Sequence, residues 1–234
     1  MAKAGSIVGL SNHGRRLGRG AHQPLVVSQL CLHAGIRKNC RVMGEMGEMG
    51  EKAGQWVDDR RRYGLVTRVL HGAMALLFAW QFLGMAIKLS QGRTPLAAFF
   101  VGTHAPVGTL LLMLLAVRLI WAGGNLRHRP PQGQGWQALA ARLGHGMLYL
   151  LMLMVPLLAG LRAYGSGRGL NVWGWQVLPA TGAKVDWMMA PGNALHGVLA
   201  WCLLALIGGH IAMALWHRVV LRDGVMARMF GPLR

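Results

Sequence analysis

Four long apolar segments dominate this sequence and constrain what the chain can fold into. They run from about Leu65 to Ile87, Ala97 to Trp121, Leu139 to Leu161 and Asn193 to Trp216. At about 1.5 Å of rise per residue, each segment is long enough to cross a hydrocarbon core of about 30 Å. The sequence therefore predicts an all-α fold, an integral membrane four-helix bundle, over residues 61–234.

The charged residues are few and strongly one-sided, with 25 Lys and Arg against 7 Asp and Glu. Nucleic-acid binders also carry such an excess, but they rarely contain helix-length apolar runs, so we expect no nucleic-acid partner. The arginines gather before the first segment, between the second and third, and after the fourth. Because Lys and Arg accumulate in cytoplasmic loops, this pattern predicts that both termini are cytoplasmic and that the loop 162–192 lies outside.

Residues 1–60 differ from the rest of the chain, being polar, glycine-rich and basic, with the short repeat MGEMGEMGE at 43–51. The apolar stretch PLVVSQLCL is too short to span a bilayer, and no convincing signal-peptide cleavage site follows it. We expect this segment to be a disordered extension, or upstream sequence read from a start codon assigned too early. Met43, Met46 and Met49 are the natural alternative starts.

Histidines are the main polar groups inside the apolar segments: His71, His104, His145, His196 and His210. There is no Asp or Glu between Asp59 and Asp186, which argues against a cation transporter or proton pump. The three cysteines lack the spacing of a zinc, iron–sulfur or covalent haem site. Haem suits this inventory, because each iron needs only two imidazoles and the group carries its own carboxylates.

Spacing along the fourth segment supports two haem sites. His196 and His210 are 14 residues apart, which corresponds to about 21 Å of rise and about 40° of rotation on a helix. One helix therefore offers a ligand near each surface of the membrane. Matching depths predict the pairs His71 with His210 and His104 with His196 as axial ligands of two b-type haems.

Other residues compete for roles at these sites. His145 lies near the expected depth of His71, so it is an alternative ligand, a propionate partner or a quinone contact. His217 follows His210 by seven residues on the same face but lies at the helix end, where a surface role is more common. Arg68 and Arg118, at cytoplasmic helix ends, are candidate propionate or quinone contacts, although topology alone also places arginines there.

Residues 60–232 resemble the bacterial di-haem cytochrome b561 family, which is related to the b-type cytochrome subunits of nickel–iron hydrogenases and formate dehydrogenases. The resemblance rests on RYGLVTRVLHG, HAPVGTLLLMLLAVRLIW, LGHGMLYLLMLMVPLLAG and, most specifically, ALHGVLAWCLLALIGGHIAMALWHRVVLRDGVMARM. The loop NVWGWQVLP is also similar. Gly72 and Ala105-Pro106 depart from the family pattern beside two ligands, which affects the expected haem potential more than haem binding.

The resemblance implies a four-helix bundle in the bacterial inner membrane, with two haem b groups held by His71, His104, His196 and His210. It also implies electron transfer between the quinone pool, ubiquinone or another quinone, and a periplasmic redox protein or small donor, superoxide being one candidate. An alternative is a membrane anchor for a separate dehydrogenase or hydrogenase-type catalytic subunit. A haem-free transporter or structural membrane protein is a third reading, which the missing carboxylates disfavour.

Overall fold

The computed structural model describes residues 56–130 and 135–230. The chain divides into two units, residues 1–51 and 52–234, and all described residues belong to the second. The expectations for the N-terminal extension therefore fall almost entirely outside the described residues.

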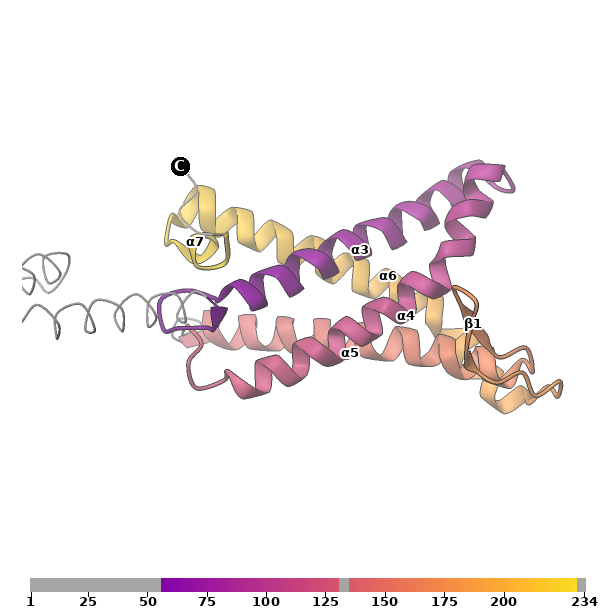
Figure 1. Ribbon diagram of the computed structural model, residues 1–234. Coiled ribbons are helices and arrows are strands. Elements are labelled where there is room, and N and C mark those ends of the chain that lie inside the picture. The colour runs from indigo at the N-terminus through magenta and orange to yellow at the C-terminus, as the bar shows by residue number, and fades with distance from the viewer. Residues whose placement is uncertain (1–55, 131–134, 231–234) are drawn as a thin grey trace, which may run out of the picture. The chain divides into compact units, whose positions relative to one another are not determined.

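Four helices of the described ranges are long and apolar enough to cross a membrane. They are α3 (Leu65–Gln91), α4 (Pro95–Gly124), α5 (Gly135–Gly165) and α6 (Asp186–Trp216), with α6 continued by a π-helical turn, η1 (His217–Leu221). The prediction of a helical membrane bundle is confirmed (Figure 1). Every helix is longer than its apolar run, and α6 begins at Asp186 rather than near Asn193.

The bundle is built from two closely packed helix pairs, α3 with α4 and α5 with α6. Its core cluster lies between α3 and α4 and consists of Met74, Val107, Leu111 and Leu115. Many large apolar side chains remain exposed, for example Leu76 at 74% and Ile120 at 78%. In water such exposure would be costly, whereas on a membrane helix these side chains face lipid.

The end of the bundle that includes the α4–α5 loop is held by a buried carboxylate. Asp58 accepts hydrogen bonds from the Gly64 backbone N–H at 2.9 Å and from the Thr67 hydroxyl at 2.7 Å, so it caps the first turn of α3 from outside the helix. Its other oxygen accepts a hydrogen bond from Arg129 at 3.2 Å. The chain before α3 is thereby tied to the loop after α4, and we name this the basic end of the bundle.

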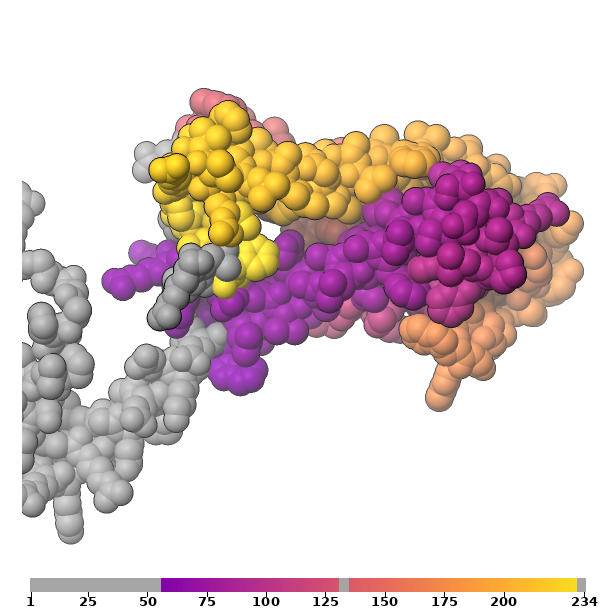
Figure 2. Space-filling view, turned by 90° about the horizontal axis from the view of Figure 1, so that it is seen from above, coloured from indigo at the N-terminus to yellow at the C-terminus, as the bar shows by residue number. Residues whose placement is uncertain are grey.

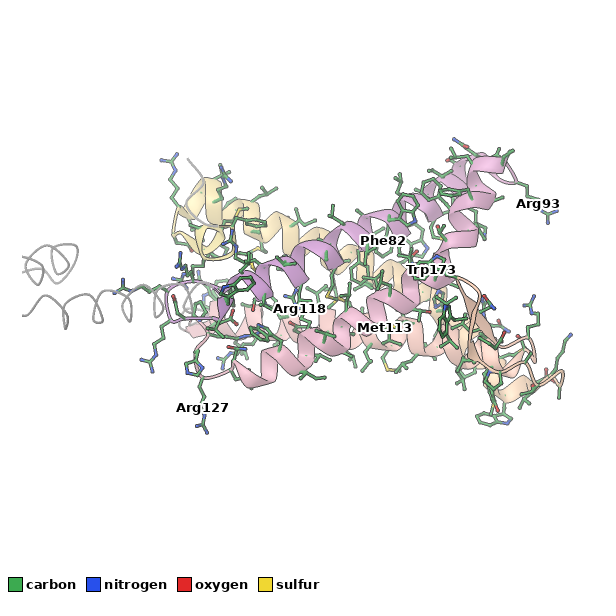
Figure 3. The ribbon with its side chains drawn as sticks, in the orientation of Figure 1. Phe82, Arg93, Met113, Arg118, Arg127 and Trp173 are labelled. Carbon is green, nitrogen blue, oxygen red and sulfur yellow. The ribbon has the colours of Figure 1, made fainter. Side chains whose placement is uncertain are left out.

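The C-terminal helix α7 (Val225–Phe230) also lies at the basic end. The Phe230 carbonyl accepts a hydrogen bond from the Arg68 guanidinium, and the Arg228 carbonyl accepts one from the Tyr63 backbone N–H, each at 3.0 Å. Arg127 lies at this end and Arg93 at the other (Figure 3). The cytoplasmic placement of both termini stays a prediction.

A short hairpin that the sequence analysis did not predict lies at the opposite end, which we name the loop end. Strands β1 (Leu170–Val172) and β2 (Trp175–Leu178) are antiparallel, with Val172 opposite Trp175. Trp173 and Gly174 form the two-residue turn with φ of 49° and 87°, a combination typical of a type I′ turn. The Asn171 side chain accepts a hydrogen bond from the Gly174 N–H and fixes this turn.

Candidate functional site

Two pairs of histidines meet across helices that are not the closely packed partners. His71 of α3 and His210 of α6 have ring centroids 6.2 Å apart at the basic end. His104 of α4 and His196 of α6 have ring centroids 6.2 Å apart at the loop end. We name them the basic-end pair and the loop-end pair. The structure thus brings together the same two pairs that helix depth suggested.

The spacing of both pairs fits a metal ion held between two imidazoles. A histidine nitrogen binds a metal at about 2 Å, so two rings on opposite sides of one ion have centres roughly 6 Å apart. The ring planes meet at 70° in the basic-end pair and at 75° in the loop-end pair, and both pairs have centroids 6.2 Å apart. Each pair is therefore a suitable set of axial ligands.

The loop-end pair shows two further signs of a ligand role. The His196 Nδ1 lies 3.0 Å from the Val155 carbonyl, which accepts its proton and leaves Nε2 free for a metal. The His104 Nδ1 is buried and has no hydrogen-bond partner among the described residues. A buried polar atom without a partner is costly, and a protein keeps one mainly where a functional role requires it.

The basic-end pair lies beside a cation without a carboxylate partner. Arg118 donates to the Tyr149 hydroxyl at 3.1 Å and approaches the His71 Nδ1 at 3.2 Å. Within the described residues Arg118 forms no ion pair. Since a half-buried guanidinium favours an anion, this place suits a carboxylate supplied by a bound group.

His71 cannot accept a hydrogen bond from Arg118 and bind a metal through Nε2 at the same time, because the two roles need different protonation of its Nδ1. Arginine only donates, so in this contact the His71 Nδ1 carries no proton. A neutral histidine that binds a metal through Nε2 carries its proton on Nδ1. Metal binding through Nε2 would therefore release the Arg118 guanidinium from His71 and leave it available to a carboxylate.

The remaining candidates have other surroundings. The His145 ring centroid is 5.3 Å from that of His210, and its Nδ1 lies 2.6 Å from the Ala141 carbonyl of its own helix. The half-buried His217, at the end of α6, contacts the Asp223 carboxylate. Arg68, considered above as a propionate or quinone contact, donates instead to the Phe230 carbonyl.

The helices leave room near the basic-end pair. The backbones of α3 and α6 are not among the closely packed pairs, although both carry ligand candidates. In the space-filling view their surfaces separate toward the end where α7 lies (Figure 2). Gly72 and Gly144, next to His71 and His145, are half-buried, yet nothing lies within 4 Å of the Cβ position of either. Open space beside half-buried imidazoles suits a flat group.

Comparison with known proteins identifies the family. Residues 62–232 match the family model described as prokaryotic cytochrome b561. The chain belongs to this family. Cytochrome b561 homolog 2 of Escherichia coli (strain K12) is 31% identical over 176 residues, which cover 73% of this chain and 92% of that protein.

Two more relatives agree with this placement. Cytochrome b561 homolog 1 of Escherichia coli (strain K12) is 32% identical over 134 residues, 54% of this chain and 72% of that protein. Cytochrome b562 of Cereibacter sphaeroides is 32% identical over 129 residues, 55% of this chain and 66% of that protein. This member of the prokaryotic cytochrome b561 family is thus a bacterial integral membrane protein, a b-type cytochrome that binds haem and transfers electrons.

Several residues at the site of this b-type cytochrome escaped the sequence analysis. Tyr149, which accepts a hydrogen bond from Arg118, looks like any interfacial aromatic residue in the sequence. Gln81 donates to the His104 carbonyl at 3.0 Å and carries no signal beyond being polar within an apolar run. Asp58 precedes α3 closely enough that a search for acidic residues near helix starts would have found it.

Proposed function

We propose that the protein holds two b-type haems, one between His71 and His210 and one between His104 and His196, and that it carries electrons across the bacterial inner membrane. The equal 6.2 Å separation of the two histidine pairs carries this proposal. His145 is the weaker candidate ligand for the basic-end site, because its ring is only 5.3 Å from His210, less than two rings bound across one metal ion require.

The residues around each pair would hold and orient the groups. Haem iron changes between ferric and ferrous forms and so accepts or gives one electron at a time. Val155 orients His196 through its carbonyl. Arg118, which contacts the Tyr149 hydroxyl and His71, would neutralise a carboxylate of the bound group. The apolar helix faces exclude water from both sites, which tunes the reduction potential.

The electron partners in this proposal are the quinone pool on one side and a donor at the loop end on the other. A quinone, ubiquinone or another, is a lipid-soluble partner that a membrane protein meets directly. The donor is a small molecule, superoxide being one candidate, or a periplasmic redox protein. Electrons then pass between the loop-end and basic-end pairs, both of which include a histidine of α6.

A membrane anchor for a separate catalytic subunit is the second candidate. The exposed hairpin favours it, because Trp173 and Trp175 at its turn are 65% and 81% exposed and offer a partner an apolar surface. The two functions differ in whether the purified protein alone transfers electrons from a small donor to quinone. Turnover without any added subunit would rule out a purely anchoring role.

Haem quantification tests the proposed sites. Pyridine haemochrome analysis of the purified protein should give two b-type haems per chain. His→Ala at 71, 104, 196 or 210 should each remove about one haem, because a single imidazole holds a b-type haem weakly in a bis-histidine site. His217→Ala is the matched control and should retain both. Absence of haem from the folded wild type, or full retention in all four variants, would contradict the proposal.

A further inference from the structure

The loop end of the bundle carries a stretch of chain without charged side chains. Residues 169–183, which include both strands of the hairpin, contain no Asp, Glu, Lys or Arg. Arg168 and Lys184 stand directly before and after this stretch, and both are exposed. Charged groups usually steer a soluble partner onto its docking surface. An uncharged stretch between two cations suits the boundary between lipid and water better, because apolar groups enter the bilayer while Lys and Arg reach its phosphates.

The hairpin rests on the bundle through one strand and leaves an apolar face exposed on the other. Strand β1 contacts α4 and α5, and its Val172 is buried. Trp173 in the turn and Trp175 in β2 remain largely exposed. Val177, two residues after Trp175 and therefore on the same face of β2, is exposed as well. The turn and β2 thus offer a cluster of apolar side chains to whatever surrounds the loop end.

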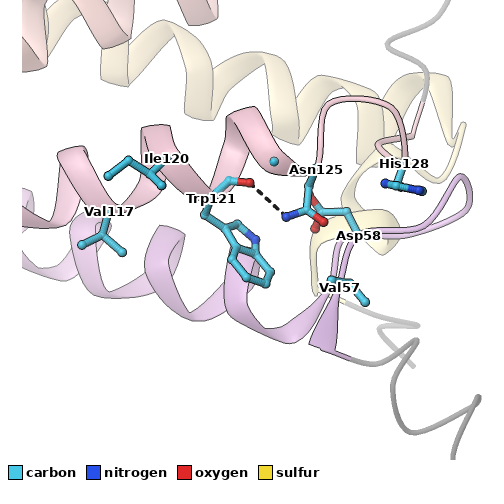
Figure 4. Close-up of a pocket in the computed structure, with 8 residues that line it drawn as sticks. Val57, Asp58, Val117, Ile120, Trp121, Asn125 and His128 are labelled. Atoms are coloured by element: carbon cyan, nitrogen blue, oxygen red, sulfur yellow. Dashed lines mark hydrogen bonds between the residues drawn. The ribbon is translucent and has the colours of Figure 1, made fainter.

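The tryptophans of the hairpin differ from a tryptophan that the bundle holds. At the basic end the Trp121 indole N–H donates to the Thr67 hydroxyl at 3.0 Å, and the Trp121 carbonyl accepts a hydrogen bond from Asn125 (Figure 4). Among the described residues, no hydrogen bond satisfies the indole N–H of Trp173 or Trp175. A ring with an apolar body and an unsatisfied donor suits the membrane–water interface, where lipid covers the ring and water or a headgroup accepts from the N–H.

The position of the hairpin along the bundle matches such an interface. Arg93 follows the last turn of α3 and marks the aqueous side of the loop end. Trp173 lies beside the bundle between the levels of Arg93 and Phe82, and so closer to the middle of the spans than Arg93 (Figure 3). In the space-filling view the α5–α6 connection, in orange, protrudes sideways from the bundle (Figure 2). A connection that extends sideways at this level meets the bilayer rather than bulk water.

We propose that the hairpin is an interfacial anchor, which inserts Trp173 and Trp175 among the phospholipid headgroups of the leaflet at the loop end. Arg168 and Lys184 then lie beside lipid phosphates, since neither forms an ion pair within the described residues. Because β1 contacts both α4 and α5, the inserted hairpin holds these two helices at a fixed depth. Helix α4 carries His104, so the anchor also fixes the depth of the loop-end pair. This inference does not depend on electron transfer by the protein.

Spin labels on the full-length chain test the anchor. The three native cysteines are first replaced by Ala, and the protein is placed in nanodiscs of phosphatidylethanolamine and phosphatidylglycerol. A nitroxide at Val177→Cys leaves both tryptophans in place. It should collide more often with oxygen, which concentrates in lipid, than with a water-soluble nickel chelate. Arg93→Cys is the matched control at the same end of the bundle, and its ratio of oxygen to nickel collisions should be severalfold lower. A label at Trp175→Cys should behave like the label at position 177.

Equal collision ratios at positions 177 and 93 would overturn the anchor. A label at position 177 that is open to nickel in nanodiscs but protected in native membranes would also overturn it, because a protein partner would then cover the hairpin, as the second candidate function requires. The haem content of the same samples separates this inference from the proposed function. Two haems beside a water-exposed hairpin leave the two-haem proposal standing, and a lipid-embedded hairpin without haem leaves the anchor standing.

Discussion

The basic-end and loop-end histidine pairs have the same ring separation but different surroundings. His71 and His210 lie near Arg118, the Tyr149 hydroxyl and a third imidazole, His145. His104 and His196 lie near a carbonyl, that of Val155, and an apolar environment that leaves the His104 Nδ1 without a partner. The fold thus repeats the separation of the histidine rings at its two ends while the charges and hydrogen bonds around them differ.

The different surroundings should give the two proposed haem sites different reduction potentials. A nearby positive charge favours the reduced iron, which carries one positive charge less, and so raises the reduction potential. A carbonyl that accepts the Nδ1 proton makes an imidazole a more basic ligand and stabilises the oxidised iron. We therefore expect the basic-end site to have the higher potential, which favours electron flow from the loop end to the basic end.

Arg118→Met should produce the largest change in the difference between the reduction potentials of the two sites. It removes the positive charge beside His71 and keeps most of the side-chain volume. The potential of the basic-end site should fall on the order of 50 mV, with the loop-end site unchanged. A potentiometric titration followed at the haem α-band measures both. Arg127→Met in the exposed loop is the control, and an equal shift there would show that the effect is not local.

His145→Leu should have a smaller effect of the opposite sign. If His71 is the ligand that faces His210, both haems remain, and the less polar surroundings raise the basic-end potential by about 20 mV. Haem content and the titration are measured on the same sample. Loss of one haem would instead make His145 a ligand and break the proposed pairing.

Tyr149→Phe should have the smallest effect. The hydroxyl holds Arg118 through a single hydrogen bond, so its loss leaves the charge in place but less fixed. A fall of on the order of 10 mV at the basic-end site is expected, with full haem content. A shift as large as that of Arg118→Met would show that Tyr149 acts on the site by itself.

The helices and the spatial pairing of the histidines could be predicted from the sequence, because both depend on the length of apolar runs and on residue spacing along single helices. Spanning length reads directly from apolar runs, and the 14 residues between His196 and His210 fix two depths on one helix. The surroundings of the pairs were not predictable in this way. Arg118 meets His71 from 47 positions away, and Asp58 meets Arg129 from 71 positions away. Such contacts depend on how the helices cross, which hydrophobic periodicity does not specify in a helix that is apolar all round.

The hairpin at the loop end escaped prediction for a related reason. Its turn places Trp173 at positive φ, whereas such turns usually carry Asn or Asp at that position. The strands are only three and four residues long, so no alternating pattern is resolved in the sequence.

The most direct test of the two-site account is a potentiometric titration of the wild type beside His196→Ala and His210→Ala. The account predicts two one-electron components in the wild type. His196→Ala should retain only the component of higher potential, and His210→Ala only the lower one. Retention of both components in either variant, or survival of the lower component in His196→Ala, would contradict it.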